Sequence, residues 1–161
     1  MHFKVPMCNS ITKPMKSQEG NKAKVSHFLG IDYGASDVGL ALADSETRIA
    51  FVYNTVKNDK YFFQKIAETV ERENVETIII GVPSHINRKD VEYEMERVGN
   101  ILEKELKVKV CYQNEMFTTK MAQANLIEKG VKGIKKHDDE EAARIILQEW
   151  LDNNKKLNNK L

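Results

Sequence analysis

The run TIIIGVP at residues 77–83 restricts the fold of this chain more than any other segment. Its isoleucines leave no polar face, and β-branched side chains favour strands over helices. A strand without a polar face is covered on both sides, which is typical of the central parallel strand of an α/β sheet. Pro83 cannot donate a ladder hydrogen bond and predicts the end of this strand. The run therefore predicts a sheet with helices on both faces.

The other hydrophobic periods predict the elements around that strand. Apolar residues alternate over about 27–32, 38–44 and 48–56, and again over 107–115, as strands do. Helical spacing occurs over 59–74, 90–106 and 118–130, and again from 138 onward, and Phe62 or Phe63 leads the first of these helices. The order β-β-β-α-β-α-β-α-α begins as a meander and continues with crossovers that require parallel strands. We expect one mixed five-stranded sheet in an α/β fold.

Chain length and composition predict one domain between two tails. The 161 residues, 41% of them hydrophobic, suffice for one core, which we place at 26–153. Residues 1–25 show no period and include five Lys and one Glu, so they predict a disordered basic tail. A later start at Met7 or Met15, or an arm that touches a phosphate backbone, stays open for this tail. The polar residues 154–161 predict a frayed end.

The charge distribution excludes a general polyanion binder. The chain beyond residue 24 carries 20 basic and 23 acidic residues, so any contact with nucleic acid has to come from local basic clusters. No apolar run reaches the ~20 residues of a membrane span, and the first residues lack the apolar core of a signal peptide. Cys8 and Cys111 form no disulfide framework and, with the histidines, no zinc-ligand spacing. We expect a cytoplasmic protein.

Three acidic positions lie where strands end or a helix begins. Asp32 stands near the end of an apolar strand, just before a Gly-rich turn, where an unpaired buried carboxylate would be costly. Either Asp32 caps its own turn through backbone N–H groups, or it faces a cation. Glu115 ends the last predicted strand, and Asp138 and Asp139 open the final helix. Ligands of α/β sheets bind beyond such strand ends.

Helix spacing distinguishes Asp139 from Asp138. Asp139 precedes Ala142 and Ala143 by three and four residues, which places it on the predicted buried face of the final helix. Asp138 precedes Glu141 by three residues, which is capping-box spacing. We therefore predict Asp138 as the cap and Asp139 as the inward acid. The alternative for Asp139 is a carboxylate that only favours the helix N-terminus electrostatically.

The three acids Asp32, Glu115 and Asp139 together suggest a metal site. Clustered carboxylates repel one another unless a cation lies among them, and oxygen ligands select Mg²⁺ or Mn²⁺. Two such ions about 4 Å apart can activate water and stabilise the leaving oxygen of a phosphodiester.

Five motifs in this order give the chain a recognisable resemblance: GIDYG at 30–34, Gly39, GVP at 81–83, EMFTT at 115–119 and DEEAARIILQEWLD at 139–152. They resemble the YqgF/RuvX family, whose members are named Holliday junction resolvase-like proteins or pre-16S rRNA nucleases. The resemblance implies an RNase H-like fold and an acidic, metal-binding catalytic triad of Asp32, Glu115 and Asp139. It also implies a nuclease that processes the 5′ end of pre-16S rRNA in ribosome biogenesis.

The chain departs from the family at positions that would hold the substrate. Ser36 and Asp37 stand where the family has a basic pair, and Asn114 and Met116 replace an acid and an arginine. Our hypothesis is that basic residues in loops flanking the acids replace the lost cations: Arg88, Lys89, Lys129, Lys132, Lys135 and Lys136. The alternative is that these are ordinary solvated side chains.

Three further polar residues are candidates for contact with nucleic acid. His137 adjoins the acids and could contact a phosphate or carry a proton near neutral pH. Thr118 and Thr119 are placed to cap their predicted helix, and a helix N-terminus also accepts a phosphate.

Three other functions use the same fold. A Holliday junction DNase shares the chemistry, and only the substrate separates it from an RNase. Sugar-kinase and actin-like ATPases also share the phosphate turn, but they need two lobes and this chain has one. A non-catalytic RNA- or ribosome-binding module is the third, with ribosome precursors as partners. Precursor rRNA is the favoured partner, branched DNA is the alternative, and the oligomeric state stays open.

Overall fold

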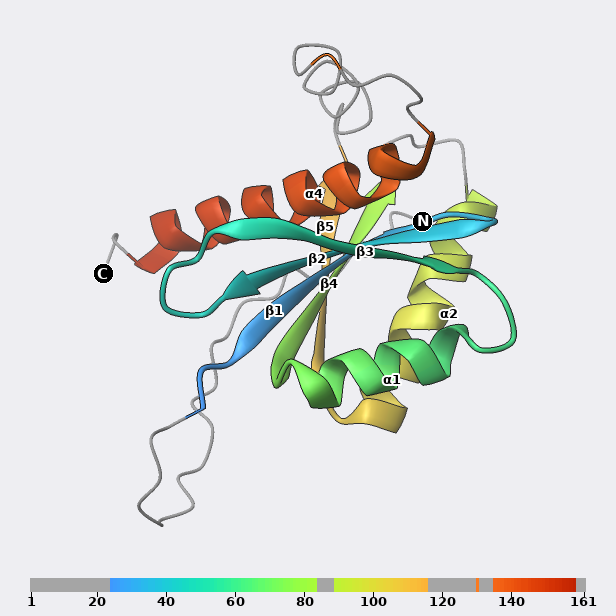
Figure 1. Cartoon of the computed structure of the whole chain (residues 1–161), viewed down its shortest axis with the longest axis horizontal. Helices are drawn as coiled ribbons and strands as arrows, with labels where there is room; N and C mark the ends of the chain where they lie inside the picture. Colours follow the sequence, from blue (N-terminus) through green and yellow to red (C-terminus); the bar gives the residue numbers. More distant parts are fainter. Residues whose placement is uncertain (1–23, 84–88, 116–129, 131–134, 159–161) are drawn as a thin grey trace.

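The computed structural model describes residues 24–83, 89–115, 130 and 135–158 (Figure 1). The predicted tail at 1–25 therefore lies almost wholly outside the described residues. The predicted helix over 118–130 also lies outside them, except for Gly130. Five candidate substrate-binding residues also lie outside the described residues: Arg88, Thr118, Thr119, Lys129 and Lys132.

The centre of the fold is one mixed five-stranded sheet in the order β3-β2-β1-β4-β5. Strands β1, β2 and β3 form an antiparallel meander, whereas β4 and β5 run parallel to β1. This arrangement confirms the predicted mixed sheet. Its strands are β1 (His27–Tyr33), β2 (Asp37–Asp44), β3 (Ala50–Lys57), β4 (Val75–Pro83) and β5 (Lys109–Glu115).

Helices cover both faces of the sheet, as the isoleucine run predicted. One long helix, α4 (Lys135–Asn158), lies along one face, and α1 (Phe62–Arg72) and α2 (Lys89–Leu106) lie along the other (Figure 1). Consecutive isoleucines of β4 serve opposite cores, because Ile79 packs with α4 whereas Ile78 and Ile80 pack with α1 and α2. In α1, Phe62 is buried and Phe63 is 39% exposed, so Phe62 leads the apolar face.

Helix α4 approaches the sheet closely because a glycine lies beneath it. A Cβ at Gly30 of β1 would lie 2.8 Å from the Leu147 Cβ and 2.9 Å from the Ala143 backbone oxygen. Ala143 and Leu147 are fully buried, one turn apart on the face of α4 that meets the sheet. Any side chain at position 30 would push the helix outward.

The start of α4 corrects two predictions. The helix begins at Lys135, so residues 135–137 are helical rather than part of a loop, and Asp138 is not the N-cap. Glu141 therefore has no N-cap at Asp138 with which to complete a capping box, and its carboxylate binds Arg144 through two hydrogen bonds of 2.7 and 2.9 Å. The physical reason is that no Gly or Pro interrupts residues 135–158.

The end of α4 also differs from the expected polar tail at 154–161. The helix continues through Asn158, and the Asn154 side-chain amide donates to the Trp150 backbone oxygen at 2.8 Å. None of the helices that the structure describes is both long and apolar enough to cross a membrane.

Candidate active site

Strand β1 places Asp32 at the end of the sheet at which the parallel strands terminate. The register aligns Ile31 of β1 with Ile80 of β4, and Ile80 with Tyr112 of β5. Asp32 follows this row by one residue and is half-buried. Strand alternation puts position 32 on the same face as Gly30, which is the face that α4 covers.

Helix α4 brings Asp139 to the neighbouring strand. Asp32 pairs with Gly39 of β2, and the Asp139 backbone lies directly over Gly39. A Cβ at position 39 would lie 1.9 Å from the Asp139 carbonyl oxygen and 2.2 Å from its carbonyl carbon. Sequence reasoning noted Gly39 only as part of a motif, and its structural signal is a glycine between the apolar residues of β2. The fold therefore brings the backbones of two of the three predicted acids into the same part of the sheet.

Glu115 ends β5 at the same edge of the sheet, opposite Pro83 of β4. Its position follows the Ile80–Tyr112 row by three residues, and β4 separates it from Asp32 by about 10 Å across the sheet. Position 115 is four residues after Cys111 on β5, so strand alternation puts it on the same face of the sheet. Cys111 packs on the face that α4 covers. Gly81 of β4 carries no side chain between these two strands.

The long α4 helix weakens the electrostatic alternative for Asp139. The favourable effect of a helix N-terminus on a carboxylate falls off within the first turn. Asp139 is the fifth residue of α4, which begins at Lys135, so it lies in the second turn. It is half-buried and one turn from the fully buried Ala143.

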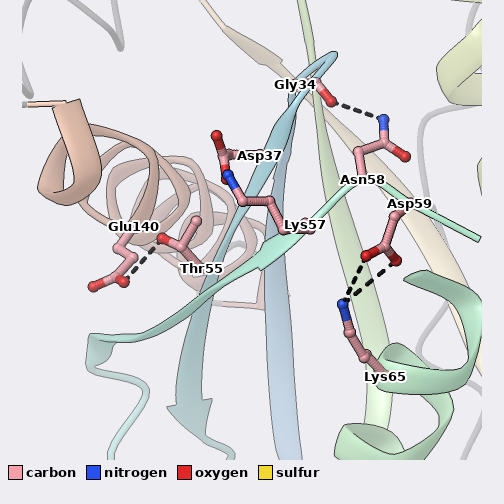
Figure 2. A network of polar contacts seen from close by, with 8 residues as sticks. All are labelled: Gly34, Asp37, Thr55, Lys57, Asn58, Asp59, Lys65 and Glu140. Carbon is pink, nitrogen blue, oxygen red and sulfur yellow. Dashed lines mark hydrogen bonds and ion pairs between the residues drawn. The ribbon is translucent and has the colours of Figure 1, made fainter. Parts of the chain in front are cut away.

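A polar contact attaches the same part of α4 to β3. Glu140 follows Asp139, and its Oε1 accepts a hydrogen bond of 2.9 Å from the Thr55 hydroxyl (Figure 2). Thr55 pairs with Gly39, which pairs with Asp32, so these residues form one row across three strands. The sequence pattern gave no sign of this contact, because Thr55 and Glu140 lie 85 residues apart.

The turn between β1 and β2 is held by the segment that follows β3. The Asn58 side-chain amide donates to the Gly34 backbone oxygen at 2.9 Å (Figure 2). The Asn58 backbone N–H donates to the Ser36 backbone oxygen at 3.0 Å. Asp37, which stands where the family has a basic residue, forms an ion pair of 2.7 Å with Lys57. The negative charge of Asp37 is therefore compensated by its cross-strand neighbour.

The opposite face of this edge carries a second polar contact. Burial raises the pKa of the Tyr33 hydroxyl, and Glu94 adds to the rise whereas a hydrogen bond with Asn58 opposes it. The Tyr33 hydroxyl donates to the Glu94 Oε1 of α2 at 3.3 Å, and its ring packs edge-on against Phe62. These contacts attach the end of β1, directly after Asp32, to both helices of that face.

The candidate substrate-binding residues lie partly in helices rather than in loops. Lys135, Lys136 and His137 form the first turn of α4, and Lys89 is the first residue of α2. The expectation that Lys89, Lys135 and Lys136 lie in loops is therefore wrong. Their backbone N–H groups belong to helix N-termini, which favour anions.

The chemistry of the acids fits a hard divalent cation. Carboxylate oxygens are the ligands that Mg²⁺ and Mn²⁺ prefer. Within the part of the chain that the structure describes, no group of three or more His, Cys, Asp or Glu side chains forms a metal site. The side chain of Glu115 lies outside the described part of the chain, so the predicted set of three stays a prediction.

Sheet order and helices on both faces define an RNase H-like fold. Among solved structures, Thermus thermophilus RuvC in complex with a Holliday junction substrate has a TM-score of 0.53 and 18% identity. The match covers 80% of this chain and 95% of that one, and it supports the fold alone.

Sequence comparison identifies the family. The model of the RuvX family, described as Holliday junction resolvase, matches residues 26–153, and the chain belongs to this family. A protein of Malacoplasma penetrans named "Putative pre-16S rRNA nuclease" is 32% identical over 133 residues, covering 78% of this chain and 94% of its own. A Lactococcus lactis subsp. cremoris protein of the same name is 33% identical, covering 79% and 94%. The predicted family and nuclease class are confirmed.

Proposed function

We propose that this chain is a divalent-metal-dependent endonuclease that processes the 5′ end of pre-16S rRNA in ribosome biogenesis. The observation that carries the proposal is the contact of the Asp139 backbone with Gly39, the strand partner of Asp32. This contact supports a shared site for two acids from distant segments. The relatives named for pre-16S rRNA support the substrate class. We place the protein in the cytoplasm, where ribosome precursors would be its partners.

In this proposal Asp32, Glu115 and Asp139 hold Mg²⁺ or Mn²⁺ and are the catalytic residues. A bound metal would supply an activated water and stabilise the leaving oxygen of the phosphodiester. The protein's part is to hold the carboxylates ionised and close together, which is unfavourable without a cation because like charges raise each other's pKa. Gly81 carries no side chain on β4, the strand between β1 and β5.

Substrate binding rests on basic and polar residues around the acids. Cations near a helix N-terminus suit a phosphate backbone, which supports a role for Lys135, Lys136 and His137 in the first turn of α4. Lys89 has the same position in α2. The proposal extends to the residues outside those that the structure describes: Arg88, Thr118, Thr119 and Lys132.

The decisive experiment is cleavage of a labelled RNA that spans the 5′ end of the 16S rRNA precursor. It is run with Mn²⁺, with Mg²⁺ and with EDTA, beside an Asp139→Asn variant. We expect cutting that needs the metal and disappears in the variant. An Asp152→Asn variant is the matched control, because it makes the same substitution further along α4 and keeps the Oδ1 that accepts from Gln148.

Other outcomes identify the alternatives. Cleavage of a four-way DNA junction but not of the RNA would assign the chain to junction resolution. RNA binding without cleavage of either substrate would indicate a non-catalytic module. A thermal shift with Mn²⁺ that is equal in the unmodified protein and in Asp139→Asn would refute the metal site.

The basic residues need a separate test. Joint replacement of Lys132, Lys135 and Lys136 by Ala should weaken RNA binding and flatten its salt dependence by about three phosphate contacts at most. The control replaces Lys104, Lys107 and Lys109, which lie at the opposite edge of the sheet where β5 begins. Equal affinity of the two triple variants would refute the substrate role.

A further inference from the structure

We propose that Thr55 and Glu140 are positioning residues, which fix the first turns of α4 over β2 and so hold Asp139 beside Asp32. The inference rests on the proposed function, because that function gives Asp32 and Asp139 the shared task of binding a metal. Neither Thr55 nor Glu140 belongs to the predicted catalytic set. Their hydrogen bond joins the helix to the edge strand at the end of the sheet where the acids lie.

Contact with Gly39 sets only the height of the helix. The backbone of Asp139 rests on position 39, which prevents α4 from moving closer to the sheet. Nothing in that contact stops the helix from sliding sideways or turning about its axis, because a glycine offers no side chain to grip. A second, directional contact is needed to set the lateral position of Asp139.

The Thr55–Glu140 hydrogen bond has the required direction. Thr55 lies in the same row as Gly39 and Asp32, one strand further out. Its hydroxyl donates to Glu140 Oε1 at 2.9 Å, and the contact is partly buried (Figure 2). Consecutive helix residues are turned by about 100°, so drawing position 140 toward β3 orients position 139 toward the strands beneath the helix.

A second set of contacts, made by Gln148, holds α4 beside β3 and so works together with the Thr55–Glu140 hydrogen bond. Two turns further along α4, Gln148 Oε1 accepts from the Ala50 backbone N–H at 3.0 Å, and Gln148 Nε2 donates to the Arg48 backbone oxygen at 3.4 Å. Arg48 also donates to the Leu151 backbone oxygen at 3.2 Å. The helix is thus held at two points about two turns apart, by β3 and by the residue Arg48 before it, and loss of the Thr55 bond releases the point nearer Asp139.

The chain offers a matched control on the same strand. The Tyr53 hydroxyl donates to Glu73 Oε1 at 2.8 Å, which ties β3 to the end of α1 on the other side of the sheet. Tyr53→Phe and Thr55→Val each remove one hydroxyl from β3 and leave its carboxylate partner in place. Thr55→Ser keeps the hydroxyl and serves as the conservative variant.

The experiment uses the full chain and two measurements besides cleavage. Hydrogen exchange of the amides at 140–144 is recorded in EDTA, and the Mn²⁺ titration midpoint is recorded by electron paramagnetic resonance. We expect Thr55→Val to exchange faster at these amides than Tyr53→Phe. We also expect its Mn²⁺ midpoint to rise, and its kcat to fall, by about 10- to 100-fold at an unchanged KM, as for other residues that orient metal ligands. Thr55→Ser should restore both.

Two results would overturn the inference, and the first of them does not depend on the proposed function. Equal amide exchange in Thr55→Val, Tyr53→Phe and the unmodified protein would show that the bond does not hold the helix. A Mn²⁺ midpoint raised equally by both substitutions would show a general loss of stability instead of positioning. If the unmodified protein and Asp139→Asn bind Mn²⁺ equally, the proposed function fails, and the exchange data still decide the positioning role.

Discussion

Replacing Gly39 by Ala should disrupt the candidate site more than the addition of a methyl group at any other glycine. The added Cβ would lie 1.9 Å from the Asp139 oxygen, whereas ordinary contacts begin at 3.4 Å, so the helix has to move by about 1.5 Å. Both partners are backbone, which cannot rotate out of the way as a side chain can. Overpacking of this kind costs about 1–3 kcal/mol of folding free energy.

The expected consequences follow from this displacement. For a chain of this length, 3 kcal/mol corresponds to a decrease in Tm of about 6–12 °C. A displacement of about 1 Å at catalytic groups can lower the rate about 100-fold. We therefore expect Gly39→Ala to remain folded, to melt earlier, and to lose Mn²⁺ affinity and RNA cleavage beyond what its stability explains.

Gly99→Ala provides the control for this experiment. A Cβ at position 99 of α2 would lie 2.1 Å from the Tyr112 hydroxyl, but that clash involves the end of a side chain on the opposite face. Calorimetry and Mn²⁺ titration of both variants separate stability from site geometry. The reasoning is refuted if Gly39→Ala has the Tm and Mn²⁺ midpoint of the unmodified protein. It is also refuted if Gly99→Ala loses as much Mn²⁺ affinity.

Two further predictions test the packing and the electrostatics of the fold. Phe62→Ala should cost about 3–5 kcal/mol in urea unfolding, because the ring is 1% exposed, whereas Phe63→Ala should cost about 1 kcal/mol; equal losses would contradict the assigned face of α1. Burial raises the pKa of Glu149, so the protonated form is favoured in the folded state and stability falls as the pH rises through that pKa. Glu149→Gln should therefore raise Tm at pH 7.5 and have a smaller effect at pH 4. A difference in Tm from the unmodified protein that is equal at both pH values would show that the Glu149 carboxylate does not destabilise the fold.

The strand and helix order could be predicted because each element has a clear local signal. The isoleucines of β4 and the alternation in β1 and β2 indicate which residues are buried, and both cores contain them. Helix ends were harder to place, because Asp138 has the spacing of a cap and yet lies inside α4. Nothing between Lys135 and Asp138 stops the helix, and a favourable cap residue does not require a helix to begin there.

The charge reversal at Asp37 illustrates why substrate grip resists prediction from sequence. Read along the chain, an acid replaces a family base and suggests weaker attraction for a phosphate backbone. In the sheet, Asp37 lies directly across from Lys57, and the two form an ion pair of 2.7 Å. Lys57 is exposed and Asp37 partly exposed, and the net charge of their pair is zero. This turn therefore lacks the two positive charges of the family's basic pair but presents no unpaired negative charge. Register between strands, and not the local sequence, decides this balance.

Placement of Asp139 depends on residues from three strands, none of which signals its role alone. Gly30 admits Ala143 and Leu147, Gly39 admits the Asp139 backbone, and Thr55 binds Glu140. Each contact restricts a different movement of α4: its tilt toward β1, its height over β2, and its lateral position relative to β3. A glycine in a strand usually weakens the sheet. The two glycines here allow close contact with α4, and this contact offsets that loss of stability. Because the three residues lie under residues 139–147 of α4, we infer that their common effect is to position Asp139 near Asp32.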